Sequence, residues 1–485
     1  MFTRSFTVAF ATSVIIAGGC ATGPKYSPPA LPTLQSYTGT ATTSAEAPVG
    51  SRSGTPPGSG QKIVLGSAPR EDWWTQLQSS ELDHVVDLAL QNNLSLEVAL
   101  ANLAKAQEGL NAARGARSIQ VDATGGAERR KYGAYFLGPQ AEAFPTFSAY
   151  TIGPTVSYDV DVFGATRHRI EAAGASADYE HEQLRAARLR VVGDTVAQAL
   201  SIASLRAQIA VVKEVLDADE KTLELVRAAR RVGVVSDIDV LQATSQRDQD
   251  RTLLPPLYQE LDVAKDALAV LIGKAPSEWS APDFALDQFV LPPELNLAVP
   301  SELVRARPDI RAAEAQLRVA SAKVGIATAD LYPRITLTSG WAEEGLLTGG
   351  TTSAWSLIGG ITAPIFHGGT LNAQRRATQD EYQAAFAEYQ LVVLKSFGQV
   401  ADTLHALDHD AEALETQQQA LTSAVSTLGL TRQGYRVGNA DILQILTAQR
   451  LYELAELGVV QARTRKLTDA VGLFLASGGG VSRRE

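Results

Sequence analysis

Arg231-Val232-Gly233 recurs 205 residues further along the chain as Arg436-Val437-Gly438, and this repeated turn decides the fold. Each copy follows a long stretch without proline, residues 165–230 and residues 370–433. Both stretches are rich in alanine, with scattered leucine and valine and regular charged residues, which predicts very long helices packed along one stripe. At 1.5 Å per residue each helix would extend about 100 Å. We expect the glycines to end these helices and turn the chain into a second helix.

The match continues without a gap beyond the turn, where Leu241 corresponds to Leu446. Self-similarity at a fixed offset indicates a repeat architecture. We therefore expect two structural repeats, residues 81–300 and 301–477, followed by a flexible glycine-rich tail at residues 478–485.

Breaker residues predict further helix boundaries inside the first repeat. Helical spacing runs from residue 82 to residue 117, with Asn92-Asn93 as the expected break between two helices. Pro255-Pro256 should interrupt the helix that follows the first turn, because proline removes a backbone donor and clashes with the preceding turn. The proline-rich segment 273–300 is expected to form a belt around the helices.

Short stretches of alternating apolar and polar residues precede each long helix. They span residues 119–124 and 150–162 in the first repeat, and residues 334–341 and 355–365 in the second. A period of two indicates strands with one apolar and one polar face. Four strands leave two open edges, which hydrocarbon does not tolerate, so such a chain could span a membrane only by closing a barrel with other copies of itself. The alternative is a soluble antiparallel sheet with one wet face.

The first twenty residues have the order of an export signal and end at the only cysteine, Cys20. A short basic start and an apolar run too short to span a bilayer lead to Ala17-Gly18-Gly19. This order indicates a lipobox, in which residues 1–19 are a signal peptide and Cys20 becomes the acylated first residue. A cleaved signal without lipid is the alternative. Residues 20–80 are then expected to form a lipidated tether, because Gly, Ser, Thr, Ala and Pro dominate much of this range.

Composition narrows the class of protein. The chain is 45% hydrophobic and 20% charged, which is ordinary for a folded protein, and its net charge is −10. An acidic chain of this kind does not offer the basic face that nucleic acid requires. Beyond the signal we find no apolar run of membrane-spanning length, so we expect strands to make any membrane crossing.

Two histidines offer a candidate metal site. His405 and His409 are four residues apart on a predicted helix with acidic residues nearby, which is the spacing of a helix-borne metal site. An exposed polar helix face has the same composition, and we favour that interpretation. The sequence shows no Ser/His/Asp grouping, phosphate loop or nucleotide fingerprint, so we expect no catalytic activity, no metal and no cofactor.

A set of short motifs is specific in combination. In chain order they are Cys20 through Pro29, Asp72-Trp73-Trp74, Ala89-Leu90-Gln91-Asn92-Asn93, Leu254-Pro255-Pro256-Leu257, Arg307-Pro308-Asp309-Ile310-Arg311-Ala312-Ala313-Glu314 and Tyr332-Pro333-Arg334-Ile335. With these motifs the chain resembles an outer membrane factor of the TolC superfamily, in the NodT-like lipoprotein branch related to OprM.

The resemblance implies an α+β membrane protein that forms a homotrimer. Four strands per chain would make a twelve-stranded outer-membrane β-barrel, and the helices a long periplasmic α-helical barrel with a small equatorial region. The implied function is the exit duct of a tripartite efflux pump that conducts small molecules such as drugs, toxic compounds or metal ions. Its implied partners are a periplasmic adaptor protein, an inner-membrane transporter of the RND type and outer-membrane lipid.

The resemblance also assigns roles to the repeated turns. Val232, Gly233 and Val234 match the turns with which the family contacts its adaptor. Val437, Gly438 and Asn439 match the second such turn. These glycines would also simply end helices, and the two interpretations are compatible, because a glycine turn lets a partner helix approach closely.

A gate is expected on the helix that leaves the second turn. Leu443, Thr447 and Arg450 lie at i, i+4 and i+7, so they share one face, and three-fold symmetry would turn each into a ring. The related ducts close with leucine, aspartate and arginine rings. Thr447 stands at the aspartate position, which argues against a strongly cation-selective ring and leaves Asp239 and Asp441 as candidates for negative charge. The alternative is that this face packs against a neighbouring helix.

Two other functions remain open from the sequence. One is a type I duct for secreted polypeptides, although the lipobox and the motif at residues 307–314 resemble the drug and metal efflux branch more. The other is a lipid-anchored coiled-coil structural protein without a conduit. Such a protein does not need alternating segments inserted at the same place in each repeat.

Overall fold

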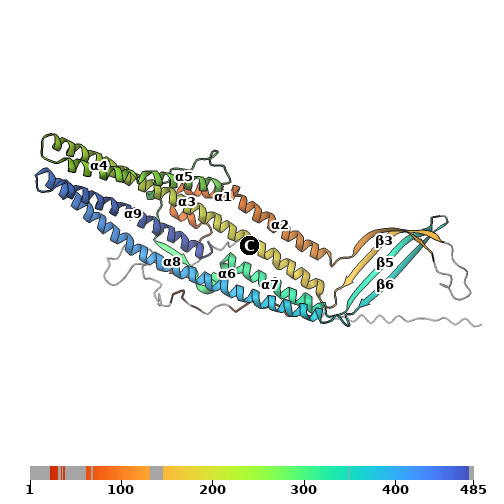
Figure 1. The fold of residues 1–485 in the computed structure, drawn as a ribbon. Coiled ribbons are helices and arrows are strands. Elements are labelled where there is room, and N and C mark those ends of the chain that lie inside the picture. The colour runs from red at the N-terminus through yellow and green to blue at the C-terminus, as the bar shows by residue number, and fades with distance from the viewer. Residues whose placement is uncertain are drawn as a thin grey trace, which may run out of the picture. The chain divides into compact units, whose positions relative to one another are not determined.

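The structure is a computed structural model that describes residues 22–30, 34, 36–38, 62–66, 69–131, 146–347 and 349–479. The predicted signal peptide, residues 1–19, and the predicted acylation site at Cys20 lie outside the described residues. The described chain combines long helices with a small number of strands, as the α+β prediction requires (Figure 1). It divides into two compact units, and each draws on both halves of the sequence.

The first unit contains a four-stranded antiparallel sheet. Its strands are β2 (Gln120–Arg130), β3 (Phe147–Val160), β5 (Arg334–Leu346) and β6 (Thr351–Thr362). They pair in the order β2-β3-β5-β6, so each half of the chain supplies one hairpin and the central β3–β5 pair joins the halves. Figure 1 shows β3, β5 and β6 side by side. The four predicted strands are confirmed, although they run longer than the alternating patterns, and β2 and β6 are the sheet's edges.

The helices follow the predicted breakers. In chain order they are α1 (Ser80–Asn92), α2 (Leu94–Gly115), α3 (Ala165–Arg231), α4 (Asp237–Arg251), α5 (Leu254–Leu271), α6 (Pro300–Ala306), α7 (Pro308–Ala329), α8 (Thr370–Arg436) and α9 (Ile442–Ala476). Helices α3 and α8 are both 67 residues long, and their bounds lie 205 residues apart at both ends. The break at Asn92-Asn93 is confirmed, and Pro255-Pro256 sits in the first turn of α5, where the missing N–H groups cost no helical hydrogen bond.

The second unit holds the main hydrophobic core. Trp73 is fully buried and stacks on Phe474 of α9 with ring centroids 5.1 Å apart. Beside this core the short strand β1 (Lys62–Leu65) pairs in parallel with β4 (Glu294–Leu297). Strand β4 lies within the segment 273–300 that was expected to form a belt.

The predicted tether and tail are both wrong in part. From Lys62 onward the described residues of the range 20–80 include strand β1 and the buried Trp73, because apolar side chains there have a core to enter. At the other end Gly478 and Gly479 are buried with positive φ, and the Gly479 N–H donates to the Phe474 carbonyl at 2.9 Å. These glycines close the C-terminus of α9, and residues 480–485 lie outside the described residues.

Helix α3 contradicts the expectation that no apolar run after the signal reaches membrane-spanning length. By length and composition α3 is apolar enough to cross a membrane, but 61% of the qualifying window is buried inside the protein. Its residues Val196, Ala199 and Leu200 pack in the main core. Since a buried core helix meets the same criterion, the apolar stretch reflects packing against neighbouring helices.

Candidate functional site

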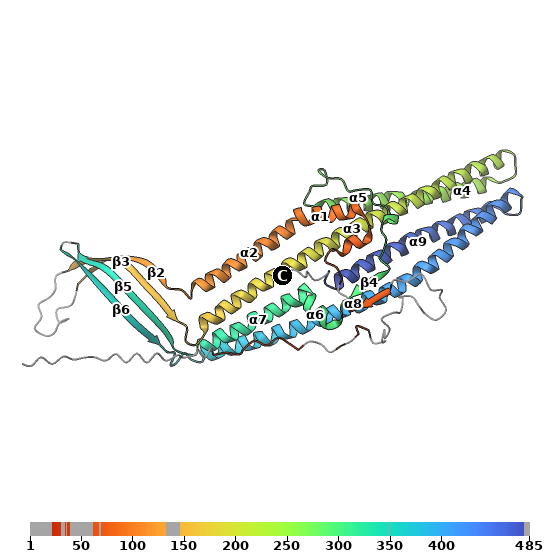
Figure 2. The same cartoon turned by 180° about the vertical axis from the view of Figure 1, so that it is seen from behind.

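The α3–α4 and α8–α9 turns have the same backbone geometry. Gly233 and Gly438 adopt φ of 81° and 80°. The N–H of Val234 donates to the Ala229 carbonyl at 3.0 Å, and the N–H of Asn439 donates to the Gly434 carbonyl at 2.8 Å. This is the Schellman arrangement, which satisfies the last carbonyls of a helix. The prediction that both glycines end long helices is confirmed, and Figure 2 shows both turns at the same end of the second unit.

Capping boxes start the helix that follows each turn. At α4 the hydroxyl of Ser236 accepts from the Asp239 N–H, and the Asp239 carboxylate accepts from the Ser236 N–H. At α9 Asp441 and Gln444 form the same reciprocal pair. Asp239 and Asp441, the two candidates for negative charge near the turns, are therefore both engaged at helix N-termini. Hydrogen bonds from Ser236 hold the pKa of Asp239 below its usual range.

The turns expose apolar side chains. Val232 and Val234 are each 75% exposed, and Val437 is 67% exposed. A Cβ atom added to Gly233 or Gly438 would meet no other group within 4 Å. Each turn therefore presents a small, uncovered apolar surface that a partner helix could approach closely.

A small core behind the turns joins the α3–α4 hairpin to α9. Its buried members are Leu223, Val226, Ala243, Ile442, Ile445 and Leu446, and we call them the tip core. These side chains are buried on one side of α9, and the opposite side of this part of α9 is exposed.

Leu443, Thr447 and Arg450 all lie on the exposed side of α9. Leu443 is 56% exposed, and the Thr447 hydroxyl donates to the Leu443 carbonyl at 2.8 Å. The prediction that the three share one face is confirmed. Within the described chain these three side chains are exposed, and their role at a gate stays a prediction.

Sequence reasoning missed three buried carboxyl groups close to the tip core, namely Asp219, Asp250 and Glu453. For Glu453 a signal existed in the sequence. It lies on the helical stripe that continues from Leu446 through Gln449, and both of these residues are buried. Asp219 and Asp250 come from α3 and α4, so their approach to Glu453 depends on tertiary packing.

The first unit fixes the described N-terminal segment. The N–H and hydroxyl of Thr22 both donate to the Phe163 carbonyl, at 3.1 and 2.9 Å. Buried His168 places Nε2 3.2 Å from the Thr22 carbonyl and Nδ1 2.7 Å from Glu171. The segment that begins two residues after Cys20 is therefore attached at the point where β3 gives way to α3.

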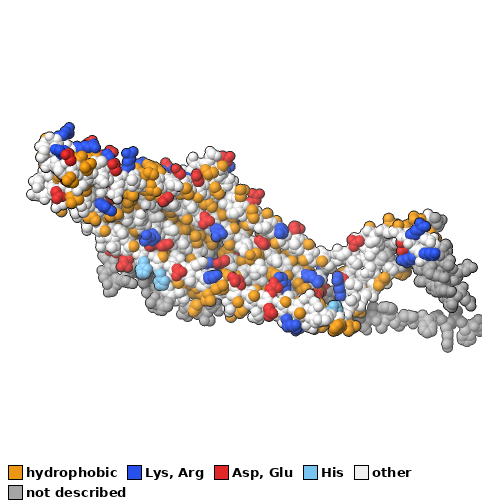
Figure 3. All heavy atoms as spheres, in the orientation of Figure 1, with side chains coloured by type: hydrophobic (Ala, Val, Ile, Leu, Met, Phe, Trp, Pro, Cys, Tyr) orange, Lys and Arg blue, Asp and Glu red, His pale blue; other side chains and the backbone are white. Residues whose placement is uncertain are grey.

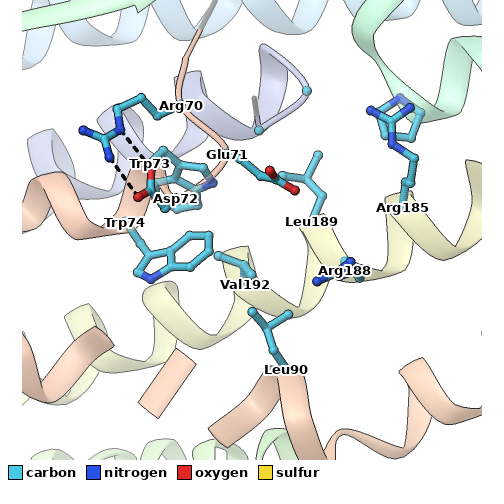
Figure 4. Close-up of a pocket in the computed structure, with 13 residues that line it drawn as sticks. Arg70, Glu71, Asp72, Trp73, Trp74, Leu90, Arg185, Arg188, Leu189 and Val192 are labelled. Atoms are coloured by element: carbon cyan, nitrogen blue, oxygen red, sulfur yellow. Dashed lines mark hydrogen bonds and ion pairs between the residues drawn. The ribbon is translucent and has the colours of Figure 1, made fainter. Parts of the chain in front are cut away.

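In the part of the chain that the structure describes, the remaining candidate sites lack a catalytic arrangement. His405 and His409 are exposed on α8, and among the described residues no group of three or more His, Cys, Asp or Glu is placed to hold a metal ion. A groove of about 780 Å³ in the second unit is lined by tryptophans, arginines and Gly478-Gly479, with Arg70 paired to Asp72 (Figure 4). No residue that lines it is a serine, cysteine or histidine. On the face drawn in Figure 3, positive and negative side chains are interspersed over the helices.

Comparison with known proteins decides the family. A family described as "Outer membrane efflux protein" matches residues 85–274 and 299–479. The chain belongs to this outer membrane efflux protein family. The resemblance to TolC-like outer membrane factors is thereby confirmed. Members of the family are outer-membrane channels of efflux systems with a periplasmic extension, and they are not enzymes.

Individual relatives cover most of the chain. The pyoverdine export outer membrane protein OpmQ of Pseudomonas aeruginosa is 31% identical over 84% of this chain and 87% of its own. The probable outer membrane lipoprotein SilC of Salmonella typhimurium is 26% identical over 98% of both chains. The solved structure of the outer-membrane channel OprN superposes with a TM-score of 0.84 at 25% identity, over 95% of this chain and 99% of that one. This outer membrane efflux protein therefore has the fold of a known outer-membrane channel.

Proposed function

We propose that three copies of this chain form one duct through the outer membrane. The observation that carries the proposal is the open sheet, in which every residue of edge strand β2 is exposed and β6 forms the opposite edge. Unpaired edges are excluded from hydrocarbon, and pairing β2 of one copy with β6 of the next removes them. Three four-stranded sheets would then close a twelve-stranded barrel.

The trimer is tested by mass and conductance together. Protein purified in mild detergent should have the mass of three chains by light scattering, and it should form pores in planar bilayers. A monomeric mass, or a trimer that never conducts, would contradict the duct. Pores would also exclude a coiled-coil structural protein without a conduit.

We propose small molecules as the cargo, expelled by a tripartite efflux pump with an RND-type transporter. The names of OpmQ and SilC describe pyoverdine export and an outer membrane lipoprotein for those proteins. A type I polypeptide duct is the second candidate. Deleting the gene should raise sensitivity to small toxic compounds, whereas loss of a secreted polypeptide with unchanged sensitivity would favour the second candidate.

The exposed turns are proposed as the contacts of the periplasmic adaptor. Three chains would present six glycine turns with uncovered valines, as a ring of helix hairpins into which partner helices can mesh. Gly233→Trp or Gly438→Trp should block crosslinking to the adaptor while the trimer still forms. Gly398→Trp is a matched control, because Gly398 lies on α8 with open space around it, 40 residues before Gly438. If both turn variants still crosslink to the adaptor, the turns only end helices and do not contact the adaptor.

A resting constriction is proposed at Leu443. Its exposed position on α9, with Thr447 and Arg450 on the same face, would form rings in a trimer. Leu443→Ala should raise single-channel conductance, and Thr447→Asp should increase cation preference. Leu430→Ala is the control, since Leu430 is 70% exposed but lies on α8, outside the proposed rings. If Leu443→Ala and Thr447→Asp leave conductance and selectivity unchanged, the constriction lies elsewhere.

Acylation is proposed at Cys20. It is supported by the sequence, in which Cys20 ends a predicted export signal, and Thr22 two residues later is held by Phe163 and His168 in the first unit. Cys20→Ser should abolish lipid labelling while export continues. Labelling that persists in this variant would contradict acylation at Cys20.

A further inference from the structure

Three buried carboxyl groups meet where the α3–α4 hairpin packs on α9. Asp219 of α3 is 2% exposed, Asp250 of α4 is 5% exposed and Glu453 of α9 is 4% exposed. All three lie in the second compact unit. Three ionised carboxylates are rarely buried together, because burial disfavours charge and like charges repel.

Donors for these carboxyl groups are few. The Gln246 side chain donates to both oxygens of Asp250 at 2.9 Å. Among the described residues, however, nothing donates to either carboxyl oxygen of Asp219 or to Oε1 of Glu453. The Asp219 carboxyl lies within hydrogen-bonding reach of Asp250. Two carboxylates contain no donor, so this contact is satisfied only when one of them carries a proton.

The surrounding cations do not neutralise the cluster. Asp219 faces Asp250, Glu453 and Arg247, and Glu453 faces Asp250 and Arg450. Arg247 is already paired with Asp248 at 2.5 Å. Burial is the largest influence on both groups. It raises the pKa of Asp219 well above its usual range and that of Glu453 to about 7.

We propose that Asp219, Asp250 and Glu453 form a buried proton-binding site that fastens the α3–α4 hairpin to α9. With a proton bound, the Asp219–Asp250 contact becomes a hydrogen bond and less charge is buried. Without it, unpaired charges are buried between the helices, and their desolvation and repulsion favour separation. The site holds a proton and not a metal ion, because no three such ligands among the described residues are arranged to coordinate one.

The pH dependence follows from linkage. The packed state binds protons more tightly than the opened state, since the packed carboxyls have raised pKa values. Packing is therefore fully favoured below the ordinary carboxyl pKa of about 4, and this contribution is lost as pH rises from there through the raised values. The same helices carry the turns and the proposed gate. Any effect on conduction rests on the proposed duct.

Hydrogen exchange of the full-length protein in detergent tests the site. After correction for intrinsic exchange, amides of α4 and α9 beside the cluster should exchange faster as pH rises from about 4 to about 7, by up to about tenfold per pH unit for each proton released, and the dependence should level off at higher pH. Asp219→Asn should weaken this pH dependence, leaving the share of Glu453, and should keep the amides better protected, because the amide donates to Asp250 without a bound proton. Asp217→Asn should behave as the parent protein, since that carboxylate is exposed and paired with Lys221.

The proposal is overturned if the parent protein shows no extra exchange at high pH, or if Asp219→Asn keeps the parent's dependence. Glu453→Gln provides a second test should Asp219→Asn fail to fold, and it should weaken the pH dependence. Conductance is recorded over the same pH range. Exchange that responds to pH while no pore forms would contradict the duct and still support the proton site.

Discussion

The two helix hairpins of this protein share a backbone and differ in side chains. The α3–α4 and α8–α9 turns correspond residue for residue at an offset of 205. They share the glycine, the closing hydrogen bonds and the capping box. Helix α9 then runs 35 residues without interruption, whereas α4 ends after 15 residues, shortly before Pro255-Pro256. The repeat therefore preserves the geometry of the turn, while the surrounding side chains give each hairpin separate contacts.

The largest expected difference between the hairpins lies in the tip core. Val226 is fully buried there, and the equivalent residue of the other hairpin, Thr431, is only half-buried. Val226→Asp should destabilise the hairpin by about 3 kcal/mol or more, because an unpaired carboxylate enters an apolar core. Thr431→Asp should cost less than about 1 kcal/mol, since water still reaches the side chain. Native-state hydrogen exchange of α3 and α8 measures both, and equal losses would contradict the asymmetry.

The caps should differ by a smaller amount. Asp441 accepts from the Gln444 N–H at 2.8 Å, whereas the Ser236 hydroxyl accepts from the Asp239 N–H at 3.4 Å. An ionised cap with the shorter bond also interacts favourably with the helix dipole. Asp441→Ala should therefore lower the local stability of α9 by about 1–2 kcal/mol, and Ser236→Ala that of α4 by about 0.5 kcal/mol. Amide exchange in the first turn of each helix measures the two losses of local stability. A larger loss for Ser236→Ala than for Asp441→Ala would contradict the expected order.

The smallest expected difference is an ion pair on one hairpin. Arg230 donates to Asp237 at 2.7 and 2.8 Å, and Tyr435 and Ile442 at the equivalent positions cannot form such a pair. Arg230 holds the pKa of Asp237 below its usual range, so the contribution is present at neutral pH and is lost as pH falls through that lowered pKa. Arg230→Gln should slightly speed exchange at the α3–α4 turn at low ionic strength. The effect should vanish in about 1 M salt, and persistence there would argue against an electrostatic origin.

Local signals in the sequence predicted the helical part of the fold well. The long helices begin at the predicted residues and end within three residues of the predicted limits, because glycine and proline act on their immediate neighbours. The β1–β4 pair escaped prediction, since each strand has four residues and its partner lies far away in the sequence. Strand β2 continues through Gly125-Gly126 to Arg130 without alternation, because pairing with β3 supplies its hydrogen bonds.

The candidate site was also predictable only where local spacing in the sequence decides it. Helical periodicity alone placed Leu443, Thr447 and Arg450 on one face, and the exposed side of α9 agrees. The carboxyl groups of Asp219 and Asp250 could not be placed near Glu453 from the sequence, since three helices bring them together. The tether prediction failed at Trp73, whose burial depends on Phe474 near the other end of the chain.

A cysteine ring at the proposed gate tests the central claim most directly. In a Cys20→Ser background, Leu443→Cys leaves one thiol per chain, because Cys20 is the only native cysteine. If three copies of Leu443 face one another at the constriction, oxidation should link chains by a disulfide and lower single-channel conductance, and reduction should restore it. Chains that remain unlinked, with conductance indifferent to oxidation, would contradict a trimeric duct gated at Leu443.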